Sequence, residues 1–258
     1  MHLRLRLLPR SFLPTCLAVV LGVPVAANAQ QADSAAAAAR ARWQSSLAAF
    51  EAADKLARPS DGGVLFVGSS TIRLWDRLSQ DFSQLPVVIN RGFGGSTMDD
   101  CGHFARQLVV AYRPRHVLVY AGDNDLAEGR SPAQVLESFQ AFVRTVRAEL
   151  PDTRIDYISI KPSPLRAALL PRAREANALL AGYVATLPNA GYIDVFTPML
   201  DGAGAPRADL YGPDRLHMNA AGYALWRSVI AARVTTPPAP LESPSPALAT
   251  RAVSTSPR

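Results

Sequence analysis

The feature that most constrains this chain is a series of five short apolar runs separated by longer stretches. The first, Val64–Gly68, has no alternation of polar and apolar residues, which is typical of a strand buried on both faces of a parallel sheet. Four further runs are similarly apolar and lie at 86–89, 116–120, 155–160 and 192–195. The runs therefore predict five buried strands.

The stretches between these runs are amphipathic and lie at 97–112, 132–149, 171–187 and 219–234. Strands that alternate with helices of this length favour right-handed crossovers and a parallel sheet covered on both faces. We therefore predict an α/β fold, a flavodoxin-like α/β/α sandwich with a five-stranded parallel sheet. This domain is expected to occupy residues 60–234.

The N-terminus has the features of a secretory signal. Three arginines precede the apolar stretch from Phe12 to Val25, and Ala27-Asn28-Ala29 offers a small-residue cleavage site. The apolar stretch is shorter than a membrane-spanning helix and contains two prolines. We expect residues 1–29 to be removed, the protein to be exported to the periplasm or secreted, and no stable membrane insertion afterwards.

Composition narrows the possible partners and the ways of stabilising the fold. The formal net charge is +6, part of which leaves with the three arginines, and no basic cluster is interleaved with aromatics. A nucleic-acid partner is therefore not expected. Cys101 is the one cysteine left after cleavage, so an intrachain disulfide is excluded.

Two segments flank the predicted domain. Residues 30–59 are rich in alanine, with Trp43, Leu47, Phe50 and Leu56 at roughly helical spacing, which predicts a leading helix over 33–57 packed on the domain. Residues 235–258 are rich in Pro, Ser and Ala and have few apolar side chains to bury. We expect this tail to be disordered.

Unusual residues follow the predicted strands. Ligands bind at the carboxyl ends of parallel strands, so these positions are candidates for a common site. Ser70 stands just past the first strand, where a sharp turn lifts a nucleophilic oxygen into a cleft. The other candidate segments are the glycine loop 90–96, Gly122-Asp123-Asn124-Asp125, the segment 161–164 and Asp214-Arg215-Leu216-His217.

Each of these segments also has an ordinary interpretation as a turn or a helix cap, and other chemistries need to be weighed. The glycine loop is not a dinucleotide fingerprint, because Thr97 stands where a third glycine is required. His103 lies near Asp99, Asp100 and Cys101, but these residues begin a helix and match no zinc spacing. His116 leads a buried strand and is interpreted as structural. We predict no metal and no cofactor.

Taken together and in order, the blocks resemble the SGNH branch of the GDSL esterase/lipase family over about residues 60–234. The resemblance implies that Ser70 is the nucleophile, His217 the base and Asp214 its orienting acid. It further implies that Ser70, Gly95 and Asn124 supply the oxyanion donors. The stretches 66–75 and 216–219 are similar to a bacterial subgroup of the family.

One position departs from the family pattern. The first block usually reads Gly-Asp-Ser, whereas here Ser69 replaces the aspartate between Gly68 and Ser70. The register of the nucleophile is unchanged. The hydrogen bonds that the aspartate supplies to neighbouring loops must therefore be replaced or lost.

The resemblance implies a carboxylic ester hydrolase that acts through an acyl-enzyme. Blocks so closely spaced leave no room for a lid domain before Asn124, which favours short-acyl esters, such as O-acetyl groups on carbohydrates. The partner would be a small-molecule or glycan ester. Alternatives are a lysophospholipase or thioesterase, or a non-catalytic envelope or carbohydrate-binding protein. Candidate substrate contacts are Trp75, Phe93, Arg166 and Tyr211, although the aromatics are equally compatible with the core.

Overall fold

Five parallel strands form the centre of the protein. The computed structural model describes residues 25–234, with side chains from Ala37 onwards. The sheet has the order β2-β1-β3-β4-β5, which is the flavodoxin-like order. The strands are β1 (Val64–Gly68), β2 (Val88–Gly92), β3 (His116–Tyr120), β4 (Arg154–Ile158) and β5 (Ala190–Ile193). The predicted fold class, with its five-stranded parallel sheet, is confirmed.

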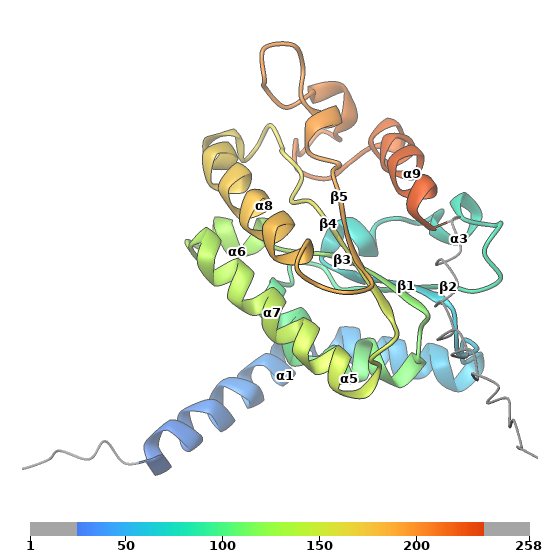
Figure 1. The fold of residues 1–258 in the computed structure, drawn as a ribbon, viewed down its shortest axis with the longest axis vertical. Helices are drawn as coiled ribbons and strands as arrows, with labels where there is room; N and C mark the ends of the chain where they lie inside the picture. The colour runs from blue at the N-terminus through green and yellow to red at the C-terminus, as the bar shows by residue number, and fades with distance from the viewer. Residues whose placement is uncertain (1–24, 235–258) are drawn as a thin grey trace, which may run out of the picture. The chain divides into compact units, whose positions relative to one another are not determined.

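The continuous apolar runs are explained by burial on both faces. Every residue of β1 and β3 is buried, and alternate side chains point to opposite helix layers. Phe66 and Leu118 pack with Trp226 of α9 (Ala220–Val234). On the other face, Tyr157 meets the Phe139 ring of α7 at a centroid distance of 4.8 Å. Figure 1 shows α7 and α8 side by side over one face and α9 over the other.

The remaining helices complete the two layers. The long helix α7 (Pro132–Glu149) has the predicted bounds, because Ser131 and Gln134 form a capping box at its start. The others in the second unit are α2 (Ser70–Arg73), α3 (Leu78–Asp81), α4 (Met98–His103), α5 (Ala105–Leu108), α6 (Asp123–Ala127), α8 (Leu170–Val184) and four 3₁₀ turns, η1 (Val110–Tyr112), η2 (Ala167–Leu169), η3 (Thr197–Met199) and η4 (Ala208–Leu210).

The chain divides into two units, residues 1–42 and 43–258. The described part of the first unit is the beginning of helix α1 (Val25–Leu56). The rest of α1, from Trp43 to Leu56, belongs to the second unit. Trp43 is buried there, and its ring meets that of Phe93 edge-on with centroids 5.0 Å apart. Leu56 was expected on the same apolar face but is 90% exposed, because it is the last residue of the helix.

The largest differences from the predicted elements are in the second strand and in the stretch 97–112. The second strand begins at Val88 rather than at 86, so the segment 90–92 belongs to β2 and not to the loop after it. β2 is an edge strand with mixed burial, and the apolar run at 86–89 covers only its first two residues. The stretch 97–112 is not one helix, because Phe104 leaves the helical region (φ −97°, ψ 12°) between α4 and α5.

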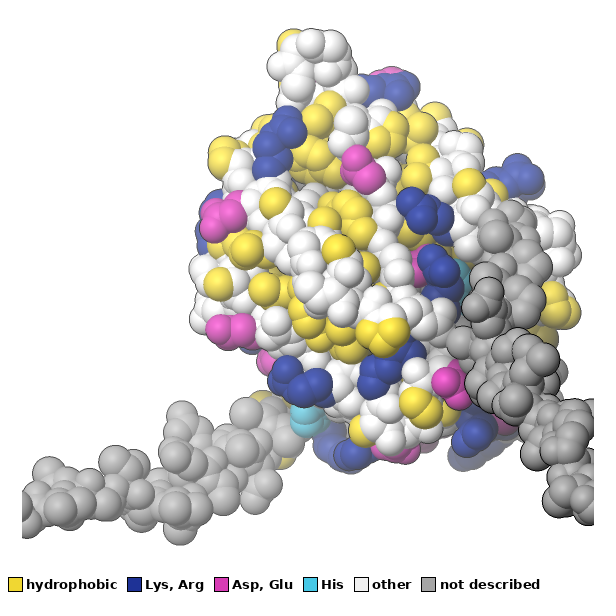
Figure 2. Space-filling view, in the orientation of Figure 1, with side chains coloured by type: hydrophobic (Ala, Val, Ile, Leu, Met, Phe, Trp, Pro, Cys, Tyr) yellow, Lys and Arg dark blue, Asp and Glu magenta, His cyan; other side chains and the backbone are white. Residues whose placement is uncertain are grey.

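Several predicted segments lie outside the described residues. These are the tail 235–258 and all of the signal peptide 1–29 except its last five residues, which fall at the start of α1. Within residues 25–234, no helix combines the length and apolar character needed to cross a membrane. On the face drawn in Figure 2, Lys and Arg side chains occur in separate small groups among apolar and acidic side chains.

Candidate active site

Ser70 is placed by a tight connection between β1 and α2. Gly68 has φ +150°, and a Cβ added there would lie 1.8 Å from the carbonyl oxygen of Tyr120. Only glycine therefore permits this close approach of β1 and β3. The next peptide is fixed by a hydrogen bond from Ser69 N to the same Tyr120 oxygen, at 3.0 Å. Ser70 then begins α2 at the carboxyl edge of the sheet.

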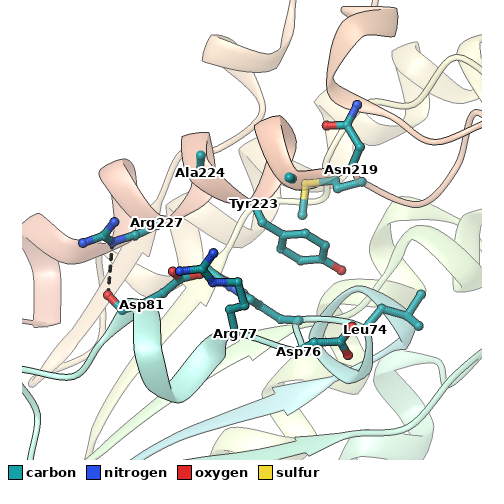
Figure 3. A pocket seen from close by; sticks show the side chains of 11 residues that line it. Leu74, Asp76, Arg77, Asp81, Asn219, Tyr223, Ala224 and Arg227 are labelled. Atoms are coloured by element: carbon teal, nitrogen blue, oxygen red, sulfur yellow. Dashed lines mark hydrogen bonds between the residues drawn. The ribbon is translucent and has the colours of Figure 1, made fainter.

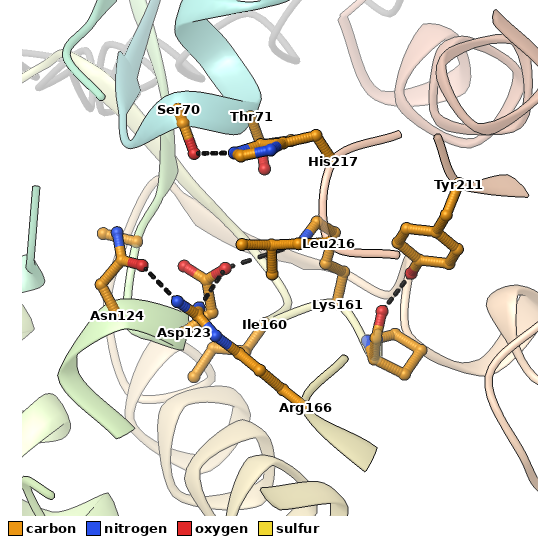
Figure 4. Close-up of polar contacts among 12 residues, drawn as sticks. Ser70, Thr71, Asp123, Asn124, Ile160, Lys161, Arg166, Tyr211, Leu216 and His217 are labelled. Carbon is orange, nitrogen blue, oxygen red and sulfur yellow. Dashed lines mark hydrogen bonds and ion pairs between the residues drawn. The ribbon is translucent and has the colours of Figure 1, made fainter. Parts of the chain in front are cut away.

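Ser70, His217 and Asp214 are linked in series. The Ser70 Oγ lies 2.9 Å from His217 Nε2 (Figure 4), and His217 Nδ1 lies 2.5 Å from Asp214 Oδ2. Ser70 and His217 are 147 residues apart in the sequence, so the contact is a product of the fold. The three side chains named by the family resemblance therefore meet.

Asp214 and His217 meet in an irregular loop before α9 and not on a helical turn, as their spacing suggested. Arg215 takes a left-handed conformation (φ +57°), and Asp214 Oδ1 accepts the backbone N–H groups of Leu216 and His217, each at 3.0 Å. These backbone bonds, with the His217 ring, lower the pKa of Asp214 to about 2. The carboxylate is thus ionised over any ordinary assay range.

Asn124 lies in the first turn of α6, just past β3. Its side-chain Nδ2 donates to the carbonyl oxygen of Ser96 at 3.0 Å, and its Oδ1 accepts from Arg166 at 3.0 Å. Gly95 precedes Ser96 in the neighbouring loop and has φ +86°. The loop after β2 and the start of α6 are thereby joined beside Ser70.

These residues surround one open hollow of about 560 Å³. It contains Ser70, His217, Gly95, Asn124 and Arg166. Its other lining residues are Ser46, Arg73, Gly94 and Leu216. Leu216 is the one lining residue with a large apolar side chain, and the other lining side chains end in hydroxyl, amide, imidazole or guanidinium groups. Of the four predicted substrate contacts, Arg166 alone lies here.

The three aromatics expected in the cleft wall are core residues. Trp75 is 1% exposed and packs with Phe66 and Trp226. Phe93 is buried against Trp43, and the Tyr211 hydroxyl donates to the carbonyl oxygen of Pro162 beneath the surface. Large aromatic side chains that follow strand ends become buried between the sheet and the helices, because their burial removes much apolar area from water. We therefore no longer interpret them as substrate contacts.

Ser69, the departure from the family pattern, is buried. Its hydroxyl has no hydrogen-bond partner among the described atoms, whereas its carbonyl oxygen accepts the N–H groups of Ile72 and Arg73. Ser69 therefore supports the turn through its backbone. The side chain itself contributes no bond to the neighbouring loops.

A buried charge cluster next to Asn124 was not found by sequence reasoning. Asp123 Oδ2 lies 3.1 Å from Arg166 and 3.5 Å from the Nζ of Lys161, which is 1% exposed. Burial lowers the pKa of Lys161, while Asp123 opposes that shift. The available signal was the position of Lys161 directly after a buried strand, where a charged residue is unusual.

The acidic residues around His103 have structural partners. Asp100 accepts from Thr97 N at 2.9 Å and from Trp43 Nε1 at 2.8 Å, and the His103 ring lies edge-on to Phe104. His116 Nε2 lies 3.2 Å from the buried Asp156. Over the described residues, no three His, Cys, Asp or Glu side chains are grouped to hold a metal ion.

A second hollow of about 440 Å³ opens between α9 and the segment after α2 (Figure 3). Tyr223 points into it from α9, and Arg227 donates to the carbonyl oxygen of Asp81 across it. Trp75 contributes to its floor and binds Asp81 through Nε1 at 2.7 Å. This hollow contains neither Ser70 nor His217.

A five-stranded parallel sheet flanked by helices, with Ser70, His217 and Asp214 in contact at its carboxyl edge, is consistent with the fold of the GDSL hydrolases. The sequence matches the GDSL-like Lipase/Acylhydrolase family over residues 61–225, which is more than half of the chain. The protein belongs to this family. Comparison with curated proteins found no match.

Solved structures with the same fold include three that illustrate its range. A Streptococcus pneumonia protein described as a candidate platelet activating factor is 17% identical, with TM-score 0.67, covering 82% of this chain and 100% of its own. A GDSL-like lipase from Bacteroides thetaiotaomicron is 21% identical, with TM-score 0.57, covering 66% and 86%. A carbohydrate esterase family 3 protein from Talaromyces cellulolyticus is 16% identical, with TM-score 0.55, covering 67% and 96%. At these identities the similarity shows the fold alone.

Proposed function

We propose that the protein is an exported serine esterase that hydrolyses short-acyl carboxylic esters through an acyl-enzyme, with O-acetyl groups on carbohydrates as the favoured substrates. Membership of the acylhydrolase family supports the reaction class. The observation that carries the proposal is the series of contacts from Ser70 Oγ to His217 and on to Asp214, at 2.9 and 2.5 Å.

The proposed reaction has two halves. In the first, Ser70 Oγ attacks the ester carbonyl carbon while its proton passes to His217 Nε2, and Asp214 accepts the Nδ1–H and stabilises the imidazolium. The tetrahedral intermediate collapses when the C–O bond to the alcohol breaks, and His217 returns the proton to that alcohol. In the second half, His217 takes a proton from water as the water oxygen attacks the acyl carbon. The bond between that carbon and Ser70 Oγ then breaks, His217 returns the proton to Ser70, and the carboxylic acid leaves.

The negative charge on the tetrahedral oxygen requires donors that are already in place. The proposed donors are the backbone N–H groups of Ser70 and Gly95 and the side-chain amide of Asn124. The Ser70 N–H lies in the first turn of α2, where an intrahelical carbonyl partner is not available. Donors aimed at this oxygen stabilise the transition state more than the bound ester.

The lining of the hollow favours small, polar substrates. Its side chains are mostly hydroxyl, amide and guanidinium groups, so a long acyl chain would gain little from burial there. This composition disfavours a lysophospholipase and suits an acetyl group on a polar alcohol. The carbohydrate esterase from Talaromyces cellulolyticus shares the fold, which is compatible with a sugar ester.

A panel of esters tests the proposal. The purified protein should hydrolyse p-nitrophenyl acetate, and kcat/KM should fall as the acyl chain is lengthened from acetyl through butyryl to octanoyl. Release of acetate from acetylated glycans, measured beside release from acetylated glycerol, then tests the carbohydrate preference. Faster turnover of octanoyl esters or of lysophospholipid would overturn the substrate class. Absence of any ester or thioester turnover would favour a non-catalytic binding protein.

A further inference from the structure

Arg166 lies beside two protein oxygens next to the candidate active site, one a hydrogen-bond partner and the other an ion-pair partner. Its NH2 group donates to Asn124 Oδ1 at 3.0 Å, and its NH1 group lies 3.1 Å from Asp123 Oδ2. The side chain is only 21% exposed. Figure 4 shows the guanidinium reaching both the Asp123 carboxylate and the Asn124 amide, away from His217.

The contact with Arg166 decides which way the Asn124 amide is turned. In the observed orientation the amide oxygen faces a donor, Arg166, and the amide nitrogen faces an acceptor, the Ser96 carbonyl. A flipped amide would place its NH2 against the guanidinium and its oxygen against a carbonyl, and both contacts would be repulsive. An amide nitrogen carries two hydrogens, and Ser96 takes one of them. The second is left for an oxygen in the hollow.

The position of Arg166 is fixed by an ion pair with Asp123 and by backbone hydrogen bonds. Asp123 Oδ2 is shared between Arg166 and the buried Lys161, so two cations are drawn to one carboxylate. The backbone is tied as well, since Arg166 N donates to the Ser163 carbonyl at 3.1 Å. Leu165 N donates to the carbonyl oxygen of Arg215 at 3.0 Å, which joins this loop to the one that carries His217.

We propose that Arg166 is a positioning residue that holds the Asn124 amide with one N–H directed at the substrate's carbonyl oxygen, and that Asp123 anchors Arg166. This inference rests on the proposed esterase function. A planar guanidinium suits the role, because its fixed fork reaches a carboxylate and an amide at once. Both terminal nitrogens of Arg166 face protein oxygens, which disfavours the other interpretation, in which Arg166 binds an anionic group of the substrate.

A double-mutant cycle between Arg166 and Asn124 tests the proposal, with kcat and KM measured on the neutral ester p-nitrophenyl acetate. We expect Arg166→Met to lower kcat by roughly 10- to 100-fold and to leave KM within about threefold, because a freely turning amide still donates part of the time. In the Asn124→Ala background, Arg166→Met should change kcat by less than about threefold. Arg166→Lys keeps the charge and should recover only part of the loss.

The matched control is Arg172→Met. Arg172 is also partly buried and donates to backbone carbonyls, those of Gly129 and Arg130, but it does not line the hollow. It should leave kcat within about twofold of wild type. Thermal midpoints of all variants are recorded. If Arg166→Met does not fold, the same cycle is run with Arg166→Lys, whose loss should again disappear in the Asn124→Ala background.

Two results would overturn the inference. Effects of Arg166 and Asn124 that multiply in the double variant would show that Arg166 does not act through the amide. A rise in KM confined to esters that carry a carboxylate, with kcat on the neutral ester unchanged, would make Arg166 a substrate contact. Failure of the esterase proposal is distinguishable, because the wild-type protein would then show no ester turnover, or a turnover that survives Ser70→Ala.

Discussion

At the scale of single residues, Ser69 and Ser70 are adjacent serines with opposite environments. Ser70 contacts His217 in the open hollow, whereas Ser69 is buried and its hydroxyl has no partner in the described structure. We expect Ser70→Ala to abolish esterase activity and Ser69→Ala to retain measurable turnover. A serine-directed phosphonate, located by peptide mass spectrometry, should label Ser70. A label on Ser69 would show that the family alignment of this block is wrong.

Substitutions of Asn124 test whether its side-chain amide is one of the oxyanion donors. Loss of one such donor typically costs on the order of 10²–10³ in kcat, so we expect Asn124→Ala to lower kcat by this factor with little change in KM. Asn124→Asp should be at least as harmful, because a carboxylate would repel the oxyanion and the Ser96 carbonyl. Steady-state kinetics measure both effects. A kcat within about threefold of wild type for Asn124→Ala would leave Ser70 and Gly95 as sufficient donors.

Asp125 is expected to make the stability of the folded protein depend on pH. Burial raises its pKa from 3.8 to about 6, against the opposing hydrogen bond from Met98 N at 2.9 Å. Between pH 3.8 and about 6 the native state therefore binds more protons than the unfolded chain. The stability that protonated Asp125 contributes is fully present below pH 3.8 and is lost as the pH rises through about 6.

An Asp125→Asn variant should remove this dependence, because the amide oxygen still accepts from Met98 but cannot ionise. Relative to wild type, its free energy of unfolding should rise by on the order of 2 kcal/mol between pH 4 and pH 7.5. Urea unfolding at the two pH values measures the difference. Parallel pH profiles for the two proteins would contradict the shifted pKa.

At the scale of elements, the site depends on how closely β1 approaches β3. Gly68→Ala would place a methyl group against the Tyr120 carbonyl oxygen, and we expect it to lower the free energy of unfolding by at least about 2 kcal/mol. Gly182→Ala in α8 is the matched control, since nothing lies within 4 Å of its added Cβ. It should be neutral or stabilise by up to about 1 kcal/mol. Equal effects of the two changes would argue against this strand contact.

At the scale of the whole molecule, the proposed export determines at which residue the mature protein begins and in which compartment it is found. Expression of the full chain in a bacterial host should yield a periplasmic or secreted protein that begins at Gln30. Cell fractionation and N-terminal mass measurement test this expectation. Recovery from the cytoplasm with residues 1–29 intact would contradict it, while an Ala27→Arg, Ala29→Arg variant should block cleavage and serve as the control.

Elements with a local signal could be predicted from the amino-acid sequence. Continuous apolar runs predicted strands buried on both faces, and the amphipathic stretch 132–149 predicted helix α7 with its bounds. The blocks after β1 and β3 and before α9 predicted Ser70, Asn124, Asp214 and His217 as neighbours, since parallel strands bring their carboxyl ends to one edge.

Features that depend on contacts between distant segments could not be predicted in this way and are set by the folded packing. The apolar run at 86–89 reaches only the first two residues of the edge strand β2, whose register is set by pairing with β1. Trp75 and Tyr211 were ambiguous because an aromatic suits a core and a cleft equally well, and packing alone separates the two. The orientation of the Asn124 side-chain amide is set by its hydrogen bond with Arg166, 42 residues further along the chain. Arg166 is in turn held in place by the charge of Asp123. Such pairings form only when the fold brings the loops together, and no local pattern encodes them.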